Sequence, residues 1–406
     1  MKFTSFPFDP SLQEGIAASN YIDTTPVQEQ VIPLILEDRD IIASAQTGTG
    51  KTAAFLLPLI HKIITGPPQG DSITSLIIVP TRELAIQIAQ HLEGLSYFTP
   101  VSSIAVYGGG DGNAFVQEKK ALSQGADIVV CTPGKMMSHI KMGYVKLNAL
   151  KYLILDEADR MLDMGFYDDI MFIIKHLEGK RQTLLFSATM PPKIRTLAKT
   201  ILNNPAEINI SISKPNEKIV QQAFLVYDAQ KIPLILHLLK AKEYKMVLIF
   251  CSSKLSVKDL TRTLKKSKIN AAEIHSDLQQ DEREQTLIDY KSGRVPILVA
   301  TDILSRGIDI DNIDLVINFD VPHDGEDYVH RIGRTARAEA DGTAFTLISV
   351  KEQRKFKSIE QLIGKDVSKM PIPTDLGEQP NYQAVVPRTA GGGNKKSFHH
   401  KGNRKK

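Results

Sequence analysis

The chain has 406 residues, which exceeds one ordinary domain and predicts about two or three. Apolar residues make up 42% of the chain and charged residues 24%, a balance that excludes a disordered or fibrous protein. The net charge of +4 is too small over this length to identify a class of ligand.

Neither end of the sequence nor its interior predicts a membrane segment. Residues 1–5 contain no apolar signal core, and no stretch approaches the roughly 18 uninterrupted apolar residues that a membrane span requires. We therefore expect a cytoplasmic protein without a membrane contact. Cys131 and Cys251 lie far apart and offer neither a disulfide framework nor the spacing of metal ligands.

Short apolar runs alternate with longer helical patterns along the chain, which predicts buried parallel strands. In the first half the predicted strands are residues 40–44, 76–79, 104–107, 128–131, 152–155 and 183–186. After a break they are residues 224–227, 246–250, 271–274, 297–300, 315–319 and 345–348. The break at residues 203–218 contains Pro205 and Pro215 and is typical of a linker.

These patterns predict an α/β fold of two tandem domains with mostly parallel sheets. We expect the first domain at residues 1–204, the linker at 205–218 and the second domain at 219–365. Residues 366–406 are expected to form a low-complexity basic tail.

A glycine-rich loop follows the first predicted strand and precedes a helical run. It reads Ala45-Gln46-Thr47-Gly48-Thr49-Gly50-Lys51-Thr52. Glycines let backbone N–H groups approach phosphates, the lysine can reach the β/γ oxygens, and Thr52 can bind magnesium. Ala45 stands where the usual pattern has glycine, but the strand–loop–helix context still favours a phosphate-binding loop over a chance turn.

An Asp-Glu-Ala-Asp stretch at residues 156–159 follows the predicted strand 152–155. Carboxylates at this end of a parallel strand hold the metal of P-loop ATPases. We expect Asp156 to orient Mg²⁺ through water and Glu157 to act as general base on the attacking water. Acidic residues also favour helix N-termini, but the phosphate loop upstream favours a catalytic site.

Three arginines, Arg331, Arg334 and Arg337, are spaced three residues apart in HRIGRTAR. On a helix this spacing would place them on one face, suited to a polyphosphate. Arg334 and Arg337 are predicted to neutralise charge on the transferred phosphoryl group, an effect worth roughly 10³–10⁵ in turnover.

Eight motifs together resemble those of the DEAD-box RNA helicases in order and spacing: AQTGTGKT, PTRELA, TPGK, DEAD, SAT, QDER, ATDILSRGID and HRIGRTAR. The resemblance covers residues 3 to 348. It implies an ATP-dependent RNA helicase with two RecA-like domains, with ATP and Mg²⁺ as cofactors and single-stranded RNA or short RNA duplexes as partner. The compact core and short basic end most resemble the bacterial RhlE-type subgroup.

The resemblance also assigns residues around the nucleotide. Gln28 is expected to read the adenine edge, and Asp302 to contact the ribose. Phe3 is at the position of the aromatic residue that packs on adenine, with Phe6 and Phe8 as alternatives.

For RNA, the resemblance implies contacts to phosphates and 2′-hydroxyls rather than to bases, so binding should prefer RNA to DNA and ignore base sequence. In the first domain the contacts would be Pro80, Thr81, Arg82, Gly108, Gly109, Thr132, Pro133 and Gly134. In the second domain they would be Arg283, Thr301 and Arg306.

Four residues depart from the family pattern. Asn20 and Thr24 replace a frequent Gly and Pro upstream of Gln28, and Ala336 replaces a Gly. Lys135 stands where Arg is commoner, which keeps the charge but loses bidentate phosphate geometry.

Ser187 and Thr189 follow the predicted strand 183–186. The resemblance implies that their hydroxyl groups link ATP hydrolysis to RNA separation. From the residues alone, a Ser/Thr turn or a helix cap explains them equally well.

The segment from Arg388 onward carries basic residues and no acidic residue. It is expected to be disordered, either as a solubilising tail or, as we favour, as a salt-sensitive arm that holds RNA near the core. We expect a monomer, and partners in ribosome assembly or RNA decay are compatible with this function.

Two other functions fit parts of the sequence. An RNA annealer or scaffold could use nucleotide only as a conformational ligand, but Lys51, Glu157 and Arg334 favour an enzyme. A DNA translocase could use the same two-domain core, but PTRELA and TPGK resemble the RNA-directed group.

Overall fold

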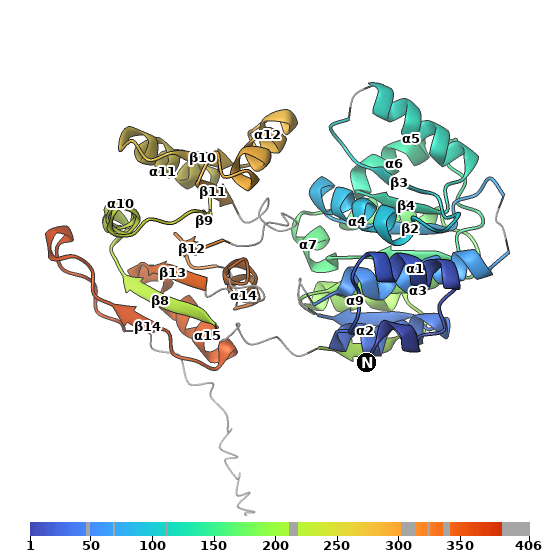
Figure 1. Cartoon of the computed structure of the whole chain (residues 1–406), viewed down its shortest axis with the longest axis horizontal. Helices are drawn as coiled ribbons and strands as arrows, with labels where there is room; N and C mark the ends of the chain where they lie inside the picture. The colour runs from blue at the N-terminus through green and yellow to red at the C-terminus, as the bar shows by residue number, and fades with distance from the viewer. Residues whose placement is uncertain are drawn as a thin grey trace, which may run out of the picture.

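The computed structural model describes residues 1–45, 49–67, 70–110, 112–210, 218–301, 313–322, 325–335 and 342–383. Figure 1 shows two α/β domains side by side, the blue-to-green one on the right and the yellow-to-red one on the left. Within the described residues each domain contains a seven-stranded sheet whose paired strands are all parallel. The predicted fold, two tandem α/β domains, is confirmed.

The first sheet has the strand order β3-β4-β2-β5-β6-β1-β7. Its strands are β1 Ile41–Ser44, β2 Ser75–Ile78, β3 Ser103–Val106, β4 Ile128–Cys131, β5 Tyr152–Leu155, β6 Gln182–Ser187 and β7 Ala206–Asn209. The helices are α1 Pro10–Ala18, α2 Pro26–Leu36, α3 Lys51–Thr65, α4 Arg82–Leu95, α5 Gly112–Gln124, α6 Pro133–Lys141, α7 Ala158–Asp163, α8 Tyr167–Lys175 and α9 Pro192–Ile201, preceded by the 3₁₀ turn η1 Phe3–Ser5.

The second sheet has the order β10-β11-β9-β12-β13-β8-β14. Its strands are β8 Ile219–Leu225, β9 Val247–Cys251, β10 Ala271–Ile274, β11 Ile297–Thr301, β12 Leu315–Asn318, β13 Gly342–Ile348 and β14 Ser368–Met370. The helices are α10 Lys231–Ala241, α11 Lys254–Lys266, α12 Gln280–Lys291, α14 Gly325–Ile332 and α15 Gln353–Ile363, with 3₁₀ turns η2 Asp228–Gln230, η3 Val350–Glu352 and η4 Thr374–Leu376.

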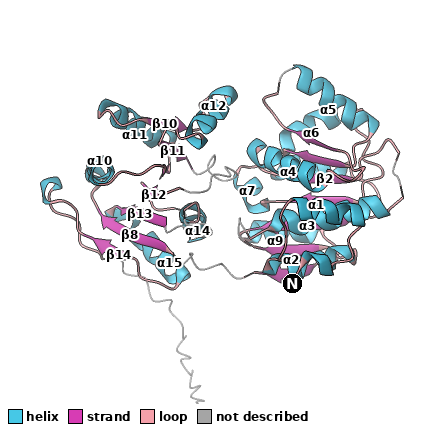
Figure 2. Ribbon diagram, viewed as in Figure 1, coloured by secondary structure: helices cyan, strands magenta, loops and turns pink. Residues whose placement is uncertain are grey.

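Helices cover both faces of each sheet (Figure 2), which explains why the strands are apolar throughout. Successive side chains of a strand point to opposite faces. In β2, Leu76 and Ile78 join the core cluster on one face while Ile77 joins the cluster on the other. The alternating side chains thus fill two cores, and the loops at the strand ends are left for binding.

All twelve predicted strands are present, as β1–β6 and β8–β13. The strand predicted at residues 224–227 lies earlier in the chain: β8 runs from Ile219 to Leu225. Two further strands, β7 and β14, were not predicted.

Strand β7 corrects the predicted linker at residues 205–218. Ala206–Asn209 pairs with β1, so the first domain extends to at least residue 209. The strand escaped prediction because it is short and at the sheet edge, and only Ile208 is buried. Residues 211–217 of that predicted linker lie outside the described residues.

Strand β14 corrects the predicted tail at residues 366–406. Residues 368–370 pair with β8, and the side chains of Val367 and Ile372 are buried. Buried Glu360 on α15 accepts hydrogen bonds from Val367 N at 2.9 Å and the Tyr382 hydroxyl at 3.0 Å, and pairs with Lys369. The second domain therefore includes residues 366–383, and the basic segment beyond lies outside the described residues.

Among the described residues, no helix combines the length and the apolar character needed to cross a bilayer.

A chain ending at Lys365 is expected to lose stability in its second domain. The truncation removes the buried apolar side chains of Val367 and Ile372. It also removes three partners of buried Glu360 and leaves it with Lys357 at 3.4 Å, and together these losses should cost about 3 kcal/mol or more. Calorimetry should show one unfolding transition lowered by about 6–12 °C. A chain ending at Gln383 is the control, and equal transition temperatures for the two chains would show that residues 366–383 are not part of the domain.

Candidate nucleotide and nucleic-acid site

The phosphate loop joins β1 to α3, with Gln46, Thr47 and Gly48 outside the described residues. Buried Lys51 at the start of α3 donates from Nζ to the Ala45 carbonyl at 2.7 Å. Gly50 has φ of +88°, and a Cβ there would lie 2.5 Å from Gln28 Nε2. Glycine is therefore required at position 50. The buried ammonium group of Lys51 is hydrogen-bonded to the first residue of the same loop.

Gln28 on α2 is hydrogen-bonded to the phosphate loop. Its side chain is 2% exposed; Nε2 donates to the Gly50 carbonyl at 3.1 Å, and Oε1 accepts from Thr25 N at 2.8 Å. Gln28 thus connects the upstream motif to the phosphate loop. Its contact with adenine stays a prediction.

The three candidate adenine-packing aromatics are all buried. Phe3 is 1% exposed and lies against Tyr21 and Phe6, with ring centroids 5.5 and 6.5 Å apart. Phe6 packs in turn on Phe8. Which of them packs on adenine stays a prediction. Nearby Asn20 has φ of +59°, which explains why the family often has glycine at this position.

Asp156 and Glu157 follow β5 and are both buried. Asp156 Oδ1 accepts from Glu157 N at 2.9 Å. Burial raises the pKa of Asp156, although the positive charge of Lys51 and the Glu157 N–H act to lower it. Glu157 has φ of +52°, a backbone conformation that costs free energy outside glycine and is found preferentially at functional sites.

The two predicted coupling residues are bonded to a residue that sequence reasoning left without a role. Asp159 Oδ2 accepts from Thr189 N at 2.9 Å and from Thr189 Oγ1 at 3.0 Å. Ser187 Oγ accepts from Asp159 N at 3.3 Å and donates to the Thr189 carbonyl at 2.7 Å. A local turn is therefore only part of the arrangement, because β5 and β6 are neighbours and their loops bind each other.

The second-domain arginines differ from the prediction. Helix α14 ends at Ile332, so Arg331 and Arg334 do not share one helix face. Arg331 is 4% exposed; its Nη1 donates to Asn318 Oδ1 at 3.0 Å and to the Asp320 carbonyl at 3.1 Å. The predicted polyphosphate-facing stripe is wrong for Arg331, because its guanidinium group satisfies buried acceptors instead.

Arg334 is also buried, in the turn that follows α14, and its N–H donates to the Arg331 carbonyl at 3.2 Å. Arg337, together with Asp302 and Arg306, lies outside the described residues. The finger role of Arg334 stays a prediction.

In the first domain, the structure brings together predicted RNA residues from two loops. Arg82 begins α4 and donates from Nη1 to the Gly108 and Gly109 carbonyls at 3.3 and 3.2 Å. Its guanidinium group lies over the Tyr107 ring at 4.7 Å. Pro80 and Thr81 precede it, and Thr81 Oγ1 caps α4 by accepting from Leu84 N. Thr132, Pro133 and Gly134 form the start of α6 after β4, the neighbour of β3.

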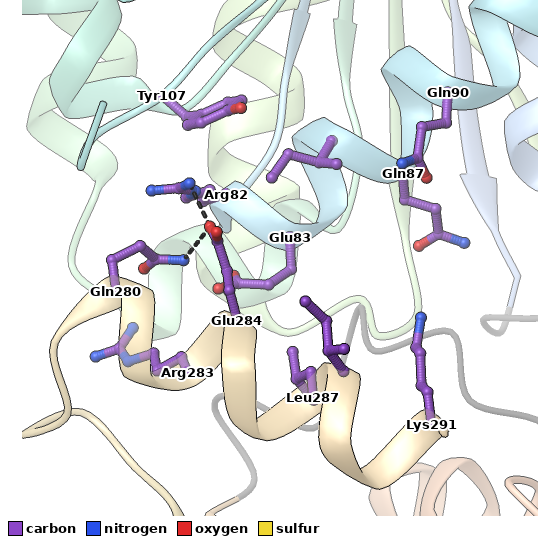
Figure 3. A pocket seen from close by; sticks show the side chains of 12 residues that line it. Arg82, Glu83, Gln87, Gln90, Tyr107, Gln280, Arg283, Glu284, Leu287 and Lys291 are labelled. Atoms are coloured by element: carbon purple, nitrogen blue, oxygen red, sulfur yellow. Dashed lines mark hydrogen bonds and ion pairs between the residues drawn. The ribbon is translucent and has the colours of Figure 1, made fainter. Parts of the chain in front are cut away.

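The second domain meets this surface through α12. Glu284 forms an ion pair with Arg82 across the domain boundary, as Figure 3 shows. Arg283 on the same helix donates to the Ser276 carbonyl at 2.9 Å, and Thr301 ends β11. Between α4 and α12 lies a pocket of about 460 Å³ lined by residues of both domains. The predicted RNA residues Arg82 and Arg283 therefore line one interdomain pocket.

The residues present fit a magnesium nucleotide. Among the described residues no group of three or more His, Cys, Asp or Glu is placed to hold a metal by itself. Mg²⁺ usually binds through one or two carboxylates together with water and substrate phosphates. Buried Asp156, close to buried Lys51 and the Gly50 turn, supplies this kind of incomplete site.

Comparison with known proteins identifies the family. The sequence model of the DEAD/DEAH box helicases matches residues 25–197, and that of the helicase conserved C-terminal domain matches residues 230–339. The chain is 41% identical over 374 residues to the ATP-dependent RNA helicase CshA of Listeria monocytogenes, covering 92% of this chain and 71% of the relative. The chain belongs to the DEAD-box ATP-dependent RNA helicases.

Other DEAD-box proteins agree with this placement. The CshA helicase of Bacillus subtilis is 38% identical over 388 residues, covering 95% of this chain and 77% of that one. Dbp5 of S. cerevisiae, solved bound to RNA and ADP BeF3, superposes with a TM-score of 0.80 at 29% identity, covering 91% of this chain and 95% of that chain. These similarities confirm the predicted RecA-like domains. The RhlE-type subgroup is not confirmed by relatives that carry the CshA name.

Asp156→Asn is expected to stabilise the nucleotide-free protein and to lower its rate of ATP hydrolysis. The raised pKa means that stability is lost as pH rises from the ordinary value of 3.8 through the folded-state pKa, so at pH 7 the ionised carboxylate destabilises the fold. Denaturant unfolding should show the variant to be more stable at neutral pH and the difference to shrink toward pH 4. ATP hydrolysis should fall by about 10- to 100-fold. A variant that is less stable at both pH values would contradict this account.

Proposed function

We propose that the chain is an ATP-dependent RNA helicase that binds single-stranded RNA and locally unwinds short RNA duplexes. Unwinding would be coupled to RNA-stimulated ATP hydrolysis in the interdomain cleft. The observation that carries the proposal is the hydrogen-bonded connection of Asp159 with Ser187 and Thr189, beside Asp156 and the phosphate loop. It joins candidate catalytic residues to the candidate coupling motif of a DEAD-box chain.

Nucleotide would be held by the first domain. Lys51 and Thr52 at the start of α3 would bind phosphate oxygens and magnesium, and Asp156 would orient the ion through water. When bound, ATP with Mg²⁺ supplies the bond to be hydrolysed and a cation that neutralises developing charge. Glu157 would accept a proton from the attacking water, since it lies next to Asp156 after β5.

RNA would be held by both domains through its backbone. Residues 80–82, 108–109 and 132–134 present backbone groups, hydroxyls and one guanidinium at the ends of β2, β3 and β4. From the second domain, Arg283 on α12 lines the same pocket as Arg82. Contacts of this kind favour 2′-hydroxyls and phosphates and ignore base sequence. The S. cerevisiae relative Dbp5 has been solved with RNA, which supports this proposal.

Closure of the cleft would connect the two ligands. ATP and RNA binding across the boundary would bring Arg334 to the γ-phosphate, and the clamped RNA strand would be too bent to stay paired. Hydrolysis would then reopen the cleft. A short duplex would lose base pairs locally, without processive movement along the strand.

Several finer assignments remain predictions from the sequence. The RhlE-type subgroup is supported only by the compact core and the short basic end. The cytoplasmic location, the monomeric state and partners in ribosome assembly or RNA decay also remain predictions.

The proposal is tested by steady-state ATP hydrolysis with magnesium, measured without nucleic acid, with single-stranded RNA and with DNA of the same sequence. We expect strong stimulation by RNA and little by DNA. Stimulation by DNA alone would favour the translocase. Binding of RNA without stimulated hydrolysis would favour the annealer or scaffold.

Two substitutions test the assigned chemistry. Glu157→Gln removes the base and should lower RNA-stimulated hydrolysis by about 10²–10⁴. Arg334→Ala removes the finger and should lower it by about 10³–10⁵. The matched controls are Glu14→Gln on α1 and Arg262→Ala on α11, which change the same residue types at exposed positions. Normal RNA-stimulated hydrolysis in either test variant would show that the assigned residue does not act in the chemistry.

A further inference from the structure

Lys135, in the first turn of α6, is held by a buried carboxylate. Glu118 on α5 is 5% exposed, and its Oε2 lies 2.8 Å from Lys135 Nζ and 3.1 Å from His139 Nε2. Buried His139 stacks on Phe115 with centroids 5.4 Å apart, and its Nδ1 is hydrogen-bonded with the Tyr144 hydroxyl. The lysine and the histidine therefore share one oxygen atom of Glu118.

This cluster lies at the candidate RNA surface. Lys135 directly follows Thr132, Pro133 and Gly134, and its side chain is 21% exposed while that of Glu118 is 6% exposed. A ligand at the start of α6 can thus reach the lysine and cannot easily reach the carboxylate. Helix α5 begins at Gly112, shortly after the Gly109 loop, and its Glu118 contacts α6 through Lys135 and His139.

The two donors differ in how firmly they are held. Burial acts to raise the pKa of Glu118, but hydrogen bonds from His139 and Lys135 outweigh it, and the pKa is lowered. Glu118 is therefore ionised, and a buried carboxylate left without a partner would be costly. His139 is fully buried and contacts the rings of Phe115 and Tyr144, so it keeps the carboxylate hydrogen-bonded when Lys135 moves.

We propose that Glu118 is a resident counter-anion for Lys135, a positioning residue that holds the ammonium group at the surface until a phosphate of the RNA backbone replaces it. His139 retains Glu118 when the lysine changes partner. The inference rests on the proposed RNA-binding function, because it requires RNA at residues 132–134. Its consequence is that Glu118 competes with phosphate, weakens the contact of Lys135 with RNA and favours release of the strand.

Arg82 shows a related arrangement in the same domain. Its guanidinium group, a candidate phosphate ligand, is paired with the Glu284 carboxylate from α12 (Figure 3). Two candidate RNA cations are thus already neutralised by carboxylates, one within the domain and one across the boundary. Phosphate binding would in both cases be an exchange of partners rather than a capture by an unpaired cation.

The test measures binding of a labelled single-stranded oligouridine to the full chain, with magnesium and a non-hydrolysable ATP analogue, over a range of KCl concentrations. The variants are Glu118→Gln, Lys135→Gln and the double variant. Glu14→Gln on exposed α1 is the control, since it changes the net charge equally away from the cluster. Thermal unfolding of each variant checks that the domain remains folded.

We expect Glu118→Gln to tighten RNA binding about two- to fivefold at low salt. The plot of log K against log salt should steepen by up to about 0.7, the value for one more neutralised phosphate on a single strand. Lys135→Gln should cost less than about twofold in the otherwise unchanged chain, because Glu118 already cancels much of the lysine's charge. It should cost more when Glu118→Gln is present.

A different pattern would overturn the proposal. Unchanged or weaker RNA binding by Glu118→Gln, with an unchanged salt slope, would mean that Glu118 only holds α5 and α6 together. If Glu118→Gln unfolds, a large loss from Lys135→Gln alone would still overturn the proposal, because the lysine is accessible and that variant leaves the buried pair of Glu118 and His139 in place. Failure of the unchanged chain to bind oligouridine would instead overturn the proposed function on which the inference rests.

Discussion

Parallel strand order is the constraint on which the candidate site depends. In a parallel sheet all the carboxyl ends lie at one edge, so the loops after neighbouring strands meet. With β5 between β2 and β6, and β1 beside β6, the loops that carry Ala45, Asp156 and Ser187 converge although they are far apart in the sequence. The hydrogen bond from Asp159 N to Ser187 Oγ and the one from Thr189 Oγ1 to Asp159 Oδ2 are direct consequences of this order.

Burial sets the second constraint, because a buried charge must be compensated. Asp156 lies near Lys51, Asp159 accepts three protein hydrogen bonds, and Arg331 donates to acceptors at the end of β12. These paired and hydrogen-bonded side chains hold the loops in one arrangement. A charge that is compensated within the protein is less available to bind a ligand. Arg331 illustrates the conflict: it resembles a phosphate ligand in sequence and serves as a structural donor in the fold.

At the candidate RNA surface the cations are also compensated by carboxylates, but they stay partly accessible to solvent. Lys135 and Arg82 remain partly accessible, and their carboxylate partners come from other helices. Lys135 can change partner because His139 stays hydrogen-bonded to buried Glu118, and Arg82 can do so because its partner Glu284 is exposed to solvent. A fully enclosed cation such as Arg331 would leave buried acceptors unpaired. Sequence reasoning identified the cations and missed the carboxylates, because Glu118 and Glu284 belong to helices whose neighbours only the fold reveals.

The sequence by itself determined the two-domain α/β fold, twelve of the strands and the family, because unbroken apolar runs and contiguous motifs are local patterns. It did not determine that Ala206–Asn209 and Ser368–Met370 are strands, since short edge strands carry few buried residues. Only the tertiary structure decided that Arg331 is buried, that Asp159 meets Thr189, and that Lys135 shares Glu118 with His139. Each of these depends on which loops and helices the sheet order brings together, and that information is not local in the chain.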